Sequence, residues 1–135
     1  MTEVEFGAGP RLVSAAWVKR VVGHTLKREK ASGKRVVVLL TDNRQIRRIN
    51  SKHLGHDYAT DVISFGMEEA GYLGDLAVSV QMARITAKEL GLGAKEELAR
   101  YLVHGTLHLL GYDDKKKQDH KRMHRRQEQL LKEIL

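Results

Sequence analysis

Hydrophobic and polar residues follow two periodic patterns along the chain, and these patterns predict the order of its secondary-structure elements. Segments that alternate, or that are continuously apolar and β-branched, predict strands, whereas apolar residues spaced three and four apart predict helices. The predicted strands cover residues 2–6, 35–41, 60–65 and 72–80. The predicted helices cover residues 11–29, 43–52, 81–90, 94–110 and 118–135. The resulting order, β-α-β-α-β-β-α-α-α, favours an α+β fold: a single domain with a mixed sheet of about four strands packed with helices.

Two features of the pattern describe the sheet in more detail. The run RVVVLLT over residues 35–41 is continuously apolar, which predicts a strand buried on both faces. The strand segments 60–65 and 72–80 are separated by the glycine-bounded stretch 66–71. This arrangement predicts a turn over 66–71 and an antiparallel hairpin.

The helix predicted over residues 94–110 carries two histidines in an otherwise apolar run, which places it at the centre of the core. His104 and His108 are four residues apart, so both imidazoles lie on one helix face and can chelate one divalent metal. A glycine suited to a helix end follows, and then two carboxylates, Asp113 and Asp114. One carboxylate could turn back to the metal. Two histidines and one carboxylate would leave a fourth position for water, as in catalytic zinc sites.

This histidine pair also has a simpler interpretation. Buried histidines usually satisfy their nitrogen atoms with hydrogen bonds, without any metal. The apolar surroundings, the glycine after the helix and the clustered acids favour the metal, because polar groups in an apolar setting need a strong partner.

Composition narrows the chemistry of such a site. The 135 residues include no cysteine and carry a formal net charge of +7, from 24 Lys+Arg against 17 Asp+Glu. A metal would therefore be held by His, Asp or Glu, without thiolates. The segment from Met1 to Phe6 contains acids, and no run approaches the ~18 apolar residues of a membrane span. We expect a cytoplasmic protein without a secretory signal or membrane segment. Its positive charge favours polyanionic partners, nucleic acid first.

The residue after the first histidine bears on the reaction. In the motif His-Glu-x-x-His the glutamate is the general base of metalloproteases, but here that position is Gly105, which disfavours peptide hydrolysis. A phosphodiester is a plausible substrate, because a metal can polarise the phosphoryl group while cations balance its charge. Seven cations just beyond the histidine pair could form an RNA-binding flank, or simply a solvated basic surface: Lys115, Lys116, Lys117, Lys121, Arg122, Arg125 and Arg126.

Three motifs together resemble a known family. The pattern His-Gly-x-Leu-His-Leu-x-Gly-Tyr-Asp-His matches the chain at His104, Gly105, Leu107, His108, Leu109, Gly111, Tyr112 and Asp113. The run TDVISF over residues 60–65 and the tripeptide GDL at 74–76 match two shorter signatures. On these residues the chain resembles the YbeY family of bacterial rRNA-maturation endoribonucleases, over about residues 35–114.

The resemblance implies a specific activity. It implies that residues 1–135 form one metal-dependent hydrolase domain with one Zn²⁺ per chain. The expected reaction is single-strand-specific cleavage of RNA, in the maturation of the 16S rRNA 3′ end and in ribosome quality control. The expected partners are single-stranded rRNA and the small ribosomal subunit. The matched positions carry over His104 and His108 as metal ligands that act in catalysis through metal-activated water.

The chain departs from the family pattern at the third ligand. The family's third histidine falls on Asp114, and a carboxylate is an acceptable zinc ligand at about 2.0–2.2 Å. The predicted ligand set is therefore His104, His108 and Asp114, and such a site could also accept other divalent metals. The alternatives to Asp114 are Asp113 and a second histidine pair, His120 and His124. The position of Asp113 suits a turn or an orienting group better, and His120 belongs to a highly charged helix that we expect to be exposed.

A second departure lies upstream of the strand signature. The family's arginine, expected to hold phosphate, is replaced by Leu54, and the proline before the threonine is Ala59. A leucine side chain cannot bind an anion. His56, His53 or Arg48 could take over this role.

Two other functions compete with the endoribonuclease. One is a non-catalytic, ribosome-associated RNA-binding factor with a structural metal, which would normally have four protein ligands. The other is a metalloprotease, which the missing glutamate disfavours.

Overall fold

Four strands form one mixed sheet in the order β1-β2-β4-β3. The computed structural model describes all 135 residues. The strands are β1 (Thr2–Phe6), β2 (Arg35–Thr41), β3 (Val62–Glu69) and β4 (Tyr72–Ser79). The pairs β1/β2 and β2/β4 are parallel, and β3/β4 is an antiparallel hairpin. The predicted order of elements, the mixed four-stranded sheet and the hairpin are all confirmed.

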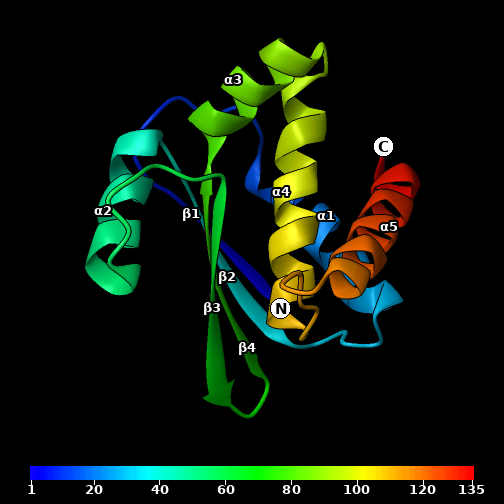
Figure 1. Cartoon of the computed structure of the whole chain (residues 1–135). Helices are drawn as coiled ribbons and strands as arrows, with labels where there is room; N and C mark the ends of the chain where they lie inside the picture. The colour runs from blue at the N-terminus through cyan, green and yellow to red at the C-terminus, as the bar shows by residue number, and fades with distance from the viewer.

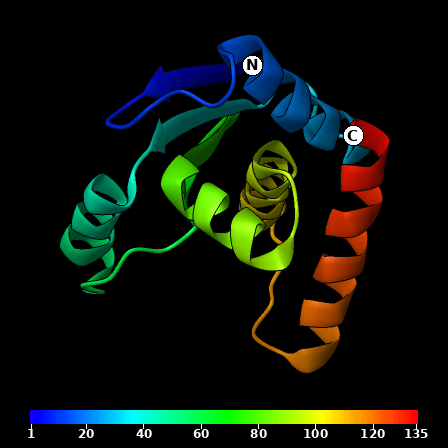
Figure 2. The same ribbon diagram turned by 90° about the horizontal axis from the view of Figure 1, so that it is seen from above.

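Five helices complete the fold, and one of them lies at its centre. They are α1 (Ala15–Arg28), α2 (Asn43–Leu54), α3 (Val80–Leu90), α4 (Ala94–Leu109) and α5 (Lys117–Ile134). α4 packs against the hairpin strands and is surrounded by α1, α3 and α5, as the end-on view in Figure 2 shows. α2 lies on the opposite side of the sheet from α4 (Figure 1). The prediction of a central α4 that carries the histidine pair is therefore confirmed.

The two faces of β2 are covered unequally, so the prediction that both are buried is wrong. Val36, Val38 and Leu40 are at most 3% exposed and pack into the main core on the α4 side. Val37 and Leu39 remain partly exposed on the other face. The reason is that α2 is the only helix on this second side of the sheet (Figure 1).

Two predicted boundaries also differ from the structure. The first helix begins at Ala15 instead of residue 11, because the Ser14 side chain accepts a hydrogen bond from the Trp17 backbone N–H at 3.1 Å and caps the helix there. β3 continues to Glu69, beyond its predicted end at residue 65. The predicted turn over 66–71 therefore shrinks to its last two residues, where Gly71 has a φ of 79°.

The five helices do not have the properties of membrane-spanning segments. None of them combines the length and the apolar character that a crossing of the bilayer requires.

Candidate metal centre

α4 presents two imidazoles on one side while its other side is buried in the core. Leu98, Leu102 and Leu107 are fully buried, whereas the side chains of His104 and His108 are 30% and 29% exposed. The chain then turns back at Gly111, which has a φ of 98°. Backbone hydrogen bonds from Gly111 to the His108 carbonyl and from Tyr112 to the Leu107 carbonyl, both 3.0 Å, close this turn.

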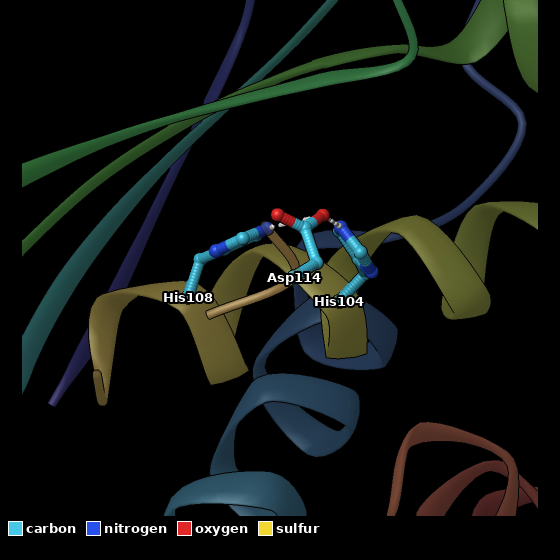
Figure 3. A group of neighbouring side chains, drawn as sticks. All are labelled: His104, His108 and Asp114. Atoms are coloured by element: carbon cyan, nitrogen blue, oxygen red, sulfur yellow. Dashed lines mark ion pairs between the residues drawn. The ribbon is translucent and has the colours of Figure 1, made fainter. Parts of the chain in front are cut away.

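The turn brings Asp114 back over the two histidines. Its Oδ2 lies 3.4 Å from His108 Nε2 and 4.0 Å from His104 Nε2. One nitrogen or oxygen atom of each residue lies within 4.8 Å of the others (Figure 3), so this donor group could hold a metal ion. The structure thus brings together the three side chains singled out in the sequence. Their role as ligands stays a prediction.

The Nδ1 atom of each imidazole is held by a hydrogen bond to the protein. His104 Nδ1–H donates to the Gln127 side-chain carbonyl at 2.7 Å, and His108 Nδ1–H donates to the Tyr112 backbone carbonyl at 3.1 Å. Both partners are acceptors, so they assign the ring protons to Nδ1. The Nε2 lone pairs are then free to face the centre of the donor group, which is how metal-binding histidines are usually held.

The electrostatics of the site favour a cation. Burial lowers the pKa of His104, which keeps this imidazole neutral at physiological pH and able to donate its lone pair. Asp114 brings a carboxylate to the same point, and a second carboxylate, Asp61, lines the cavity in front of the group. The cavity therefore combines two carboxylates with imidazole nitrogen donors.

This cavity has a volume of about 520 Å³ and lies between α4, β3 and the loop that precedes β3. We call it the cleft. α4 approaches the hairpin closely at Gly105, where a Cβ atom would lie 2.9 Å from methyl groups of Val62 and Leu76. The Ser64 hydroxyl donates to the Gly105 carbonyl at 3.2 Å across this contact. The glycine that replaces a protease glutamate therefore serves close packing of the helix on the sheet.

The alternative third ligands lie outside the donor group. The exposed Asp113 accepts a hydrogen bond from the Lys115 backbone N–H at 3.0 Å, which makes it a turn residue. His120 and His124 are exposed on α5 and stack on each other with ring centroids 6.5 Å apart. Of the carboxylates and histidines considered, Asp114 alone joins the pair.

The structure also separates the three candidates for the role of the missing arginine. Leu54, at the position of that arginine, lines the cleft and is 48% exposed. His56 lines the same cleft. His53 instead packs edge-on against Phe65 at 5.7 Å between ring centroids, and Arg48 lies in a basic groove on α2. Only His56 is positioned to face a ligand in the cleft.

Two polar residues around the site were missed in the sequence. Gln127 is 6% exposed and shares the buried face of α5 with Met123, Leu130 and Leu131. Asn50 is 2% exposed, one turn after the buried Ile46 on α2. In both cases the available signal was a polar residue in register with an apolar stripe, because such a residue needs a specific partner.

Most of the cations beyond the pair remain exposed on the segment that leads into α5 and on α5 itself. Arg126 is the exception, because its Nε donates to Glu29 at 2.7 Å. The exposed members are Lys115, Lys116, Lys117, Lys121, Arg122 and Arg125. Their predicted contact with RNA stays a prediction.

Comparisons with known proteins agree with the motifs. The family model described as "Endoribonuclease YbeY" matches residues 11–135. A curated protein named endoribonuclease YbeY from Bacillus licheniformis is 40% identical over 114 residues, covering 75% of this chain and 72% of the relative. One of the same name from Salinibacter ruber is 32% identical over 142 residues, covering 98% and 90%. A Thermotoga maritima protein with a solution structure shares the fold, with a TM-score of 0.70 and 24% identity over 99% of this chain and 89% of that one.

Proposed function

Because the chain belongs to the YbeY endoribonuclease family, we propose that it is a metal-dependent endoribonuclease that cleaves single-stranded RNA. The observation that carries this proposal is the convergence of His104, His108 and Asp114 on one point beside an open cleft. The family resemblance further suggests maturation of the 16S rRNA 3′ end and ribosome quality control as the cellular role. In this proposal residues 1–135 act as one hydrolase domain on the small ribosomal subunit in the cytoplasm.

We propose one Zn²⁺ per chain as the cofactor. The donor set contains two imidazole nitrogens and one carboxylate oxygen, which suits zinc and leaves a coordination position open. The hydrogen bonds at both Nδ1 atoms support this choice, since they direct the Nε2 lone pairs to one centre. Other divalent metals of similar size fit the same donors.

A divalent ion held by His104, His108 and Asp114 would supply a Lewis acid for a phosphoryl oxygen and would lower the pKa of a bound water molecule. The protein's own contribution is to orient and position the side chains that would hold this ion. Gln127 and the Tyr112 carbonyl fix the tautomers of His104 and His108, which we propose as the catalytic residues acting through the metal. The neutral state of His104, favoured by its lowered pKa, keeps the donor set ready at physiological pH.

Acidic and basic side chains are distributed differently around the cleft. Its own ionised side chains are the carboxylates Asp61 and Asp114, so a phosphate would be attracted mainly by the bound cation. Exposed cations lie on α2, on the segment before α5 and on α5 itself: Arg44, Arg48, Lys52, Lys115, Lys116, Lys117, Lys121, Arg122 and Arg125. Such flanks would bind the phosphates of a longer strand, which predicts that affinity falls steeply with salt.

The competing functions have less support. A structural metal normally has four protein ligands, whereas the donor group has three. A metalloprotease needs a general base where this chain has Gly105, and that position is packed against the sheet.

A matched pair of histidine variants tests the proposal. We expect the purified protein and His124→Ala, which alters an exposed histidine on α5, to hold about one metal per chain and to cleave a single-stranded RNA oligonucleotide. His108→Ala should lose both the metal and the cleavage. Full metal content in His108→Ala would refute the ligand assignment. A metal-loaded wild-type protein that cleaves no RNA would refute the enzymatic function.

A further inference from the structure

Two aromatic rings stack on the wall of the cleft, in the loop between α2 and β3. The rings of His56 and Tyr58 lie 13° from parallel, with centroids 5.4 Å apart, and Tyr58 Oη lies 3.2 Å from His56 Nδ1. Both residues line the cavity that also contains the donor group. Tyr58 is 51% exposed, so this pair, which we call the platform, keeps ring surface open to a ligand.

The core of the protein does not account for this tyrosine. Tyr101 is 6% exposed and belongs to the main core. Tyr72 and Tyr112 are half-buried, and their hydroxyls donate to Asp75 and Glu29. Tyr58 differs from these three because its ring is exposed and its hydroxyl contacts only its partner in the stack.

The loop that carries the platform is held in place on both sides. Gly55 ends α2 with a φ of 71°, which turns the chain towards the cleft. Arg47 donates two hydrogen bonds to Asp57, at 2.8 and 3.2 Å. The buried Asn50 donates its side-chain N–H to the Tyr58 carbonyl at 3.0 Å. A surface ordered in advance loses less conformational entropy when a ligand binds.

The surroundings of the platform suit a flat ligand better than a second phosphate. The exposed Leu54 lines the same cleft as the platform. The acidic side chains of this cleft are Asp61 and Asp114. Ring faces beside an exposed apolar side chain bind planar rings, and they do so without requiring a particular base. A nucleobase is such a ring, and its phosphate can still lie at the donor group.

We propose that His56 and Tyr58 form a stacking site for one unpaired nucleobase next to the phosphodiester bond that is cleaved. This inference rests on the proposed endoribonuclease function and adds a substrate contact to it. A base inside a duplex has both faces covered by its neighbours, so only an unstacked base can occupy the site. The platform would thus contribute to selection of single strands, at the place where the family's arginine is replaced by Leu54.

Variants of Tyr58 test the site through binding and turnover together. On a single-stranded oligonucleotide, Tyr58→Ala should raise KM on the order of tenfold. Tyr58→Phe keeps the ring and should stay within about twofold of wild type. The metal content of both variants should be unchanged. Equal KM values for the alanine and phenylalanine variants would overturn the proposal. If Tyr58→Ala unfolds at a lower temperature, Tyr58→Leu provides the same comparison with the apolar volume retained.

A scan with single abasic sites locates the base. At one position of the oligonucleotide, removal of the base should raise KM for wild type and leave KM of Tyr58→Ala unchanged. His56→Ala should lose part of the same dependence. If every abasic substrate affects wild type and Tyr58→Ala equally, the platform does not bind a base and the proposal is wrong.

A binding measurement separates this proposal from the proposed function. Fluorescence anisotropy with the same oligonucleotide in EDTA reports affinity without turnover. Weaker binding by Tyr58→Ala than by Tyr58→Phe supports the platform even if no cleavage is seen. Cleavage by wild type, together with identical affinity and KM in both variants, would leave the endoribonuclease intact and refute the platform.

Discussion

His104 and Gln127 are joined by a hydrogen bond of 2.7 Å that connects the central helix α4 to α5. Gln127 is held in turn, because its side-chain N–H donates to Glu128 at 3.0 Å. Glu128 receives two hydrogen bonds, each of 3.0 Å, from Arg100, which lies one turn before His104 on α4. The imidazole is therefore oriented by a closed chain of polar contacts between the two helices.

This chain predicts the effect of Gln127 on metal affinity. We expect Gln127→Ala to weaken metal binding about 10- to 100-fold, the usual loss when a residue that orients a ligand is removed. Gln118→Ala, at an exposed position on the same helix, should have no effect. Competition with a chromophoric chelator measures both. Unchanged affinity in Gln127→Ala would mean that the hydrogen bond does not orient a metal ligand.

The two adjacent aspartates provide a second test. Asp114→Ala should lower metal affinity by at least about tenfold, because it removes one of three donors. Asp113→Ala should leave the affinity unchanged, since its carboxylate accepts only the Lys115 N–H in the turn. The same chelator competition distinguishes them. The opposite ranking would assign the third ligand to Asp113.

The close contact at Gly105 predicts opposite effects for two glycine-to-alanine changes in helices. Gly105→Ala should lower the free energy of unfolding by about 1 kcal/mol, because overpacking costs about 1–3 kcal/mol and outweighs a helix-propensity gain of about 1 kcal/mol. Gly23→Ala in α1 should raise it by up to about 1 kcal/mol, since no atom lies within 4 Å of the added methyl group. Urea denaturation measures both, and stabilisation by Gly105→Ala would contradict the packing argument.

Local patterns were enough for the order of the elements and for the histidine pair, because helix and strand periods are properties of short segments. Contacts between distant segments left no such signal. The bond between His104 and Gln127 joins positions 23 residues apart, and its only trace was a glutamine in an apolar stripe. The exposure of Val37 could not be predicted either, since a continuous apolar run does not reveal how many helices cover a sheet. The choice of Asp114 over Asp113 came from the family pattern, because the local spacing alone allowed either carboxylate to follow the turn at Gly111.

An ion-pair cluster between α1 and α5 predicts a pH dependence of stability. A hydrogen bond from Arg28, and a second, less influential one from His24, lower the pKa of Glu133 from 4.5 to about 2. The unfolded chain therefore takes up this proton at higher pH than the folded protein does. The cluster stabilises the fold fully above pH 4.5, and this stabilisation is lost as the pH falls from 4.5 towards 2.

Glu133→Gln tests this dependence. The variant should be less stable than wild type at neutral pH, and the difference should shrink as the pH falls below about 4.5. Glu89→Gln, at an exposed position on α3, should show no such trend. Urea midpoints at several pH values between 7 and 3 measure the effect. A difference that stays constant over this range would show that Glu133 does not titrate in the way its partners imply.

Tyr112 has a consequence for the site as a whole. Tyr112 lies two residues before Asp114. Its hydroxyl donates to Glu29, just after α1, at 3.0 Å, and its backbone carbonyl orients His108. The position of the third donor thus depends on a contact with the first helix of the chain. A short synthetic peptide with the sequence of residues 104–114 would contain every donor and still lack the anchor. We therefore expect such a peptide to bind zinc far more weakly than the folded protein.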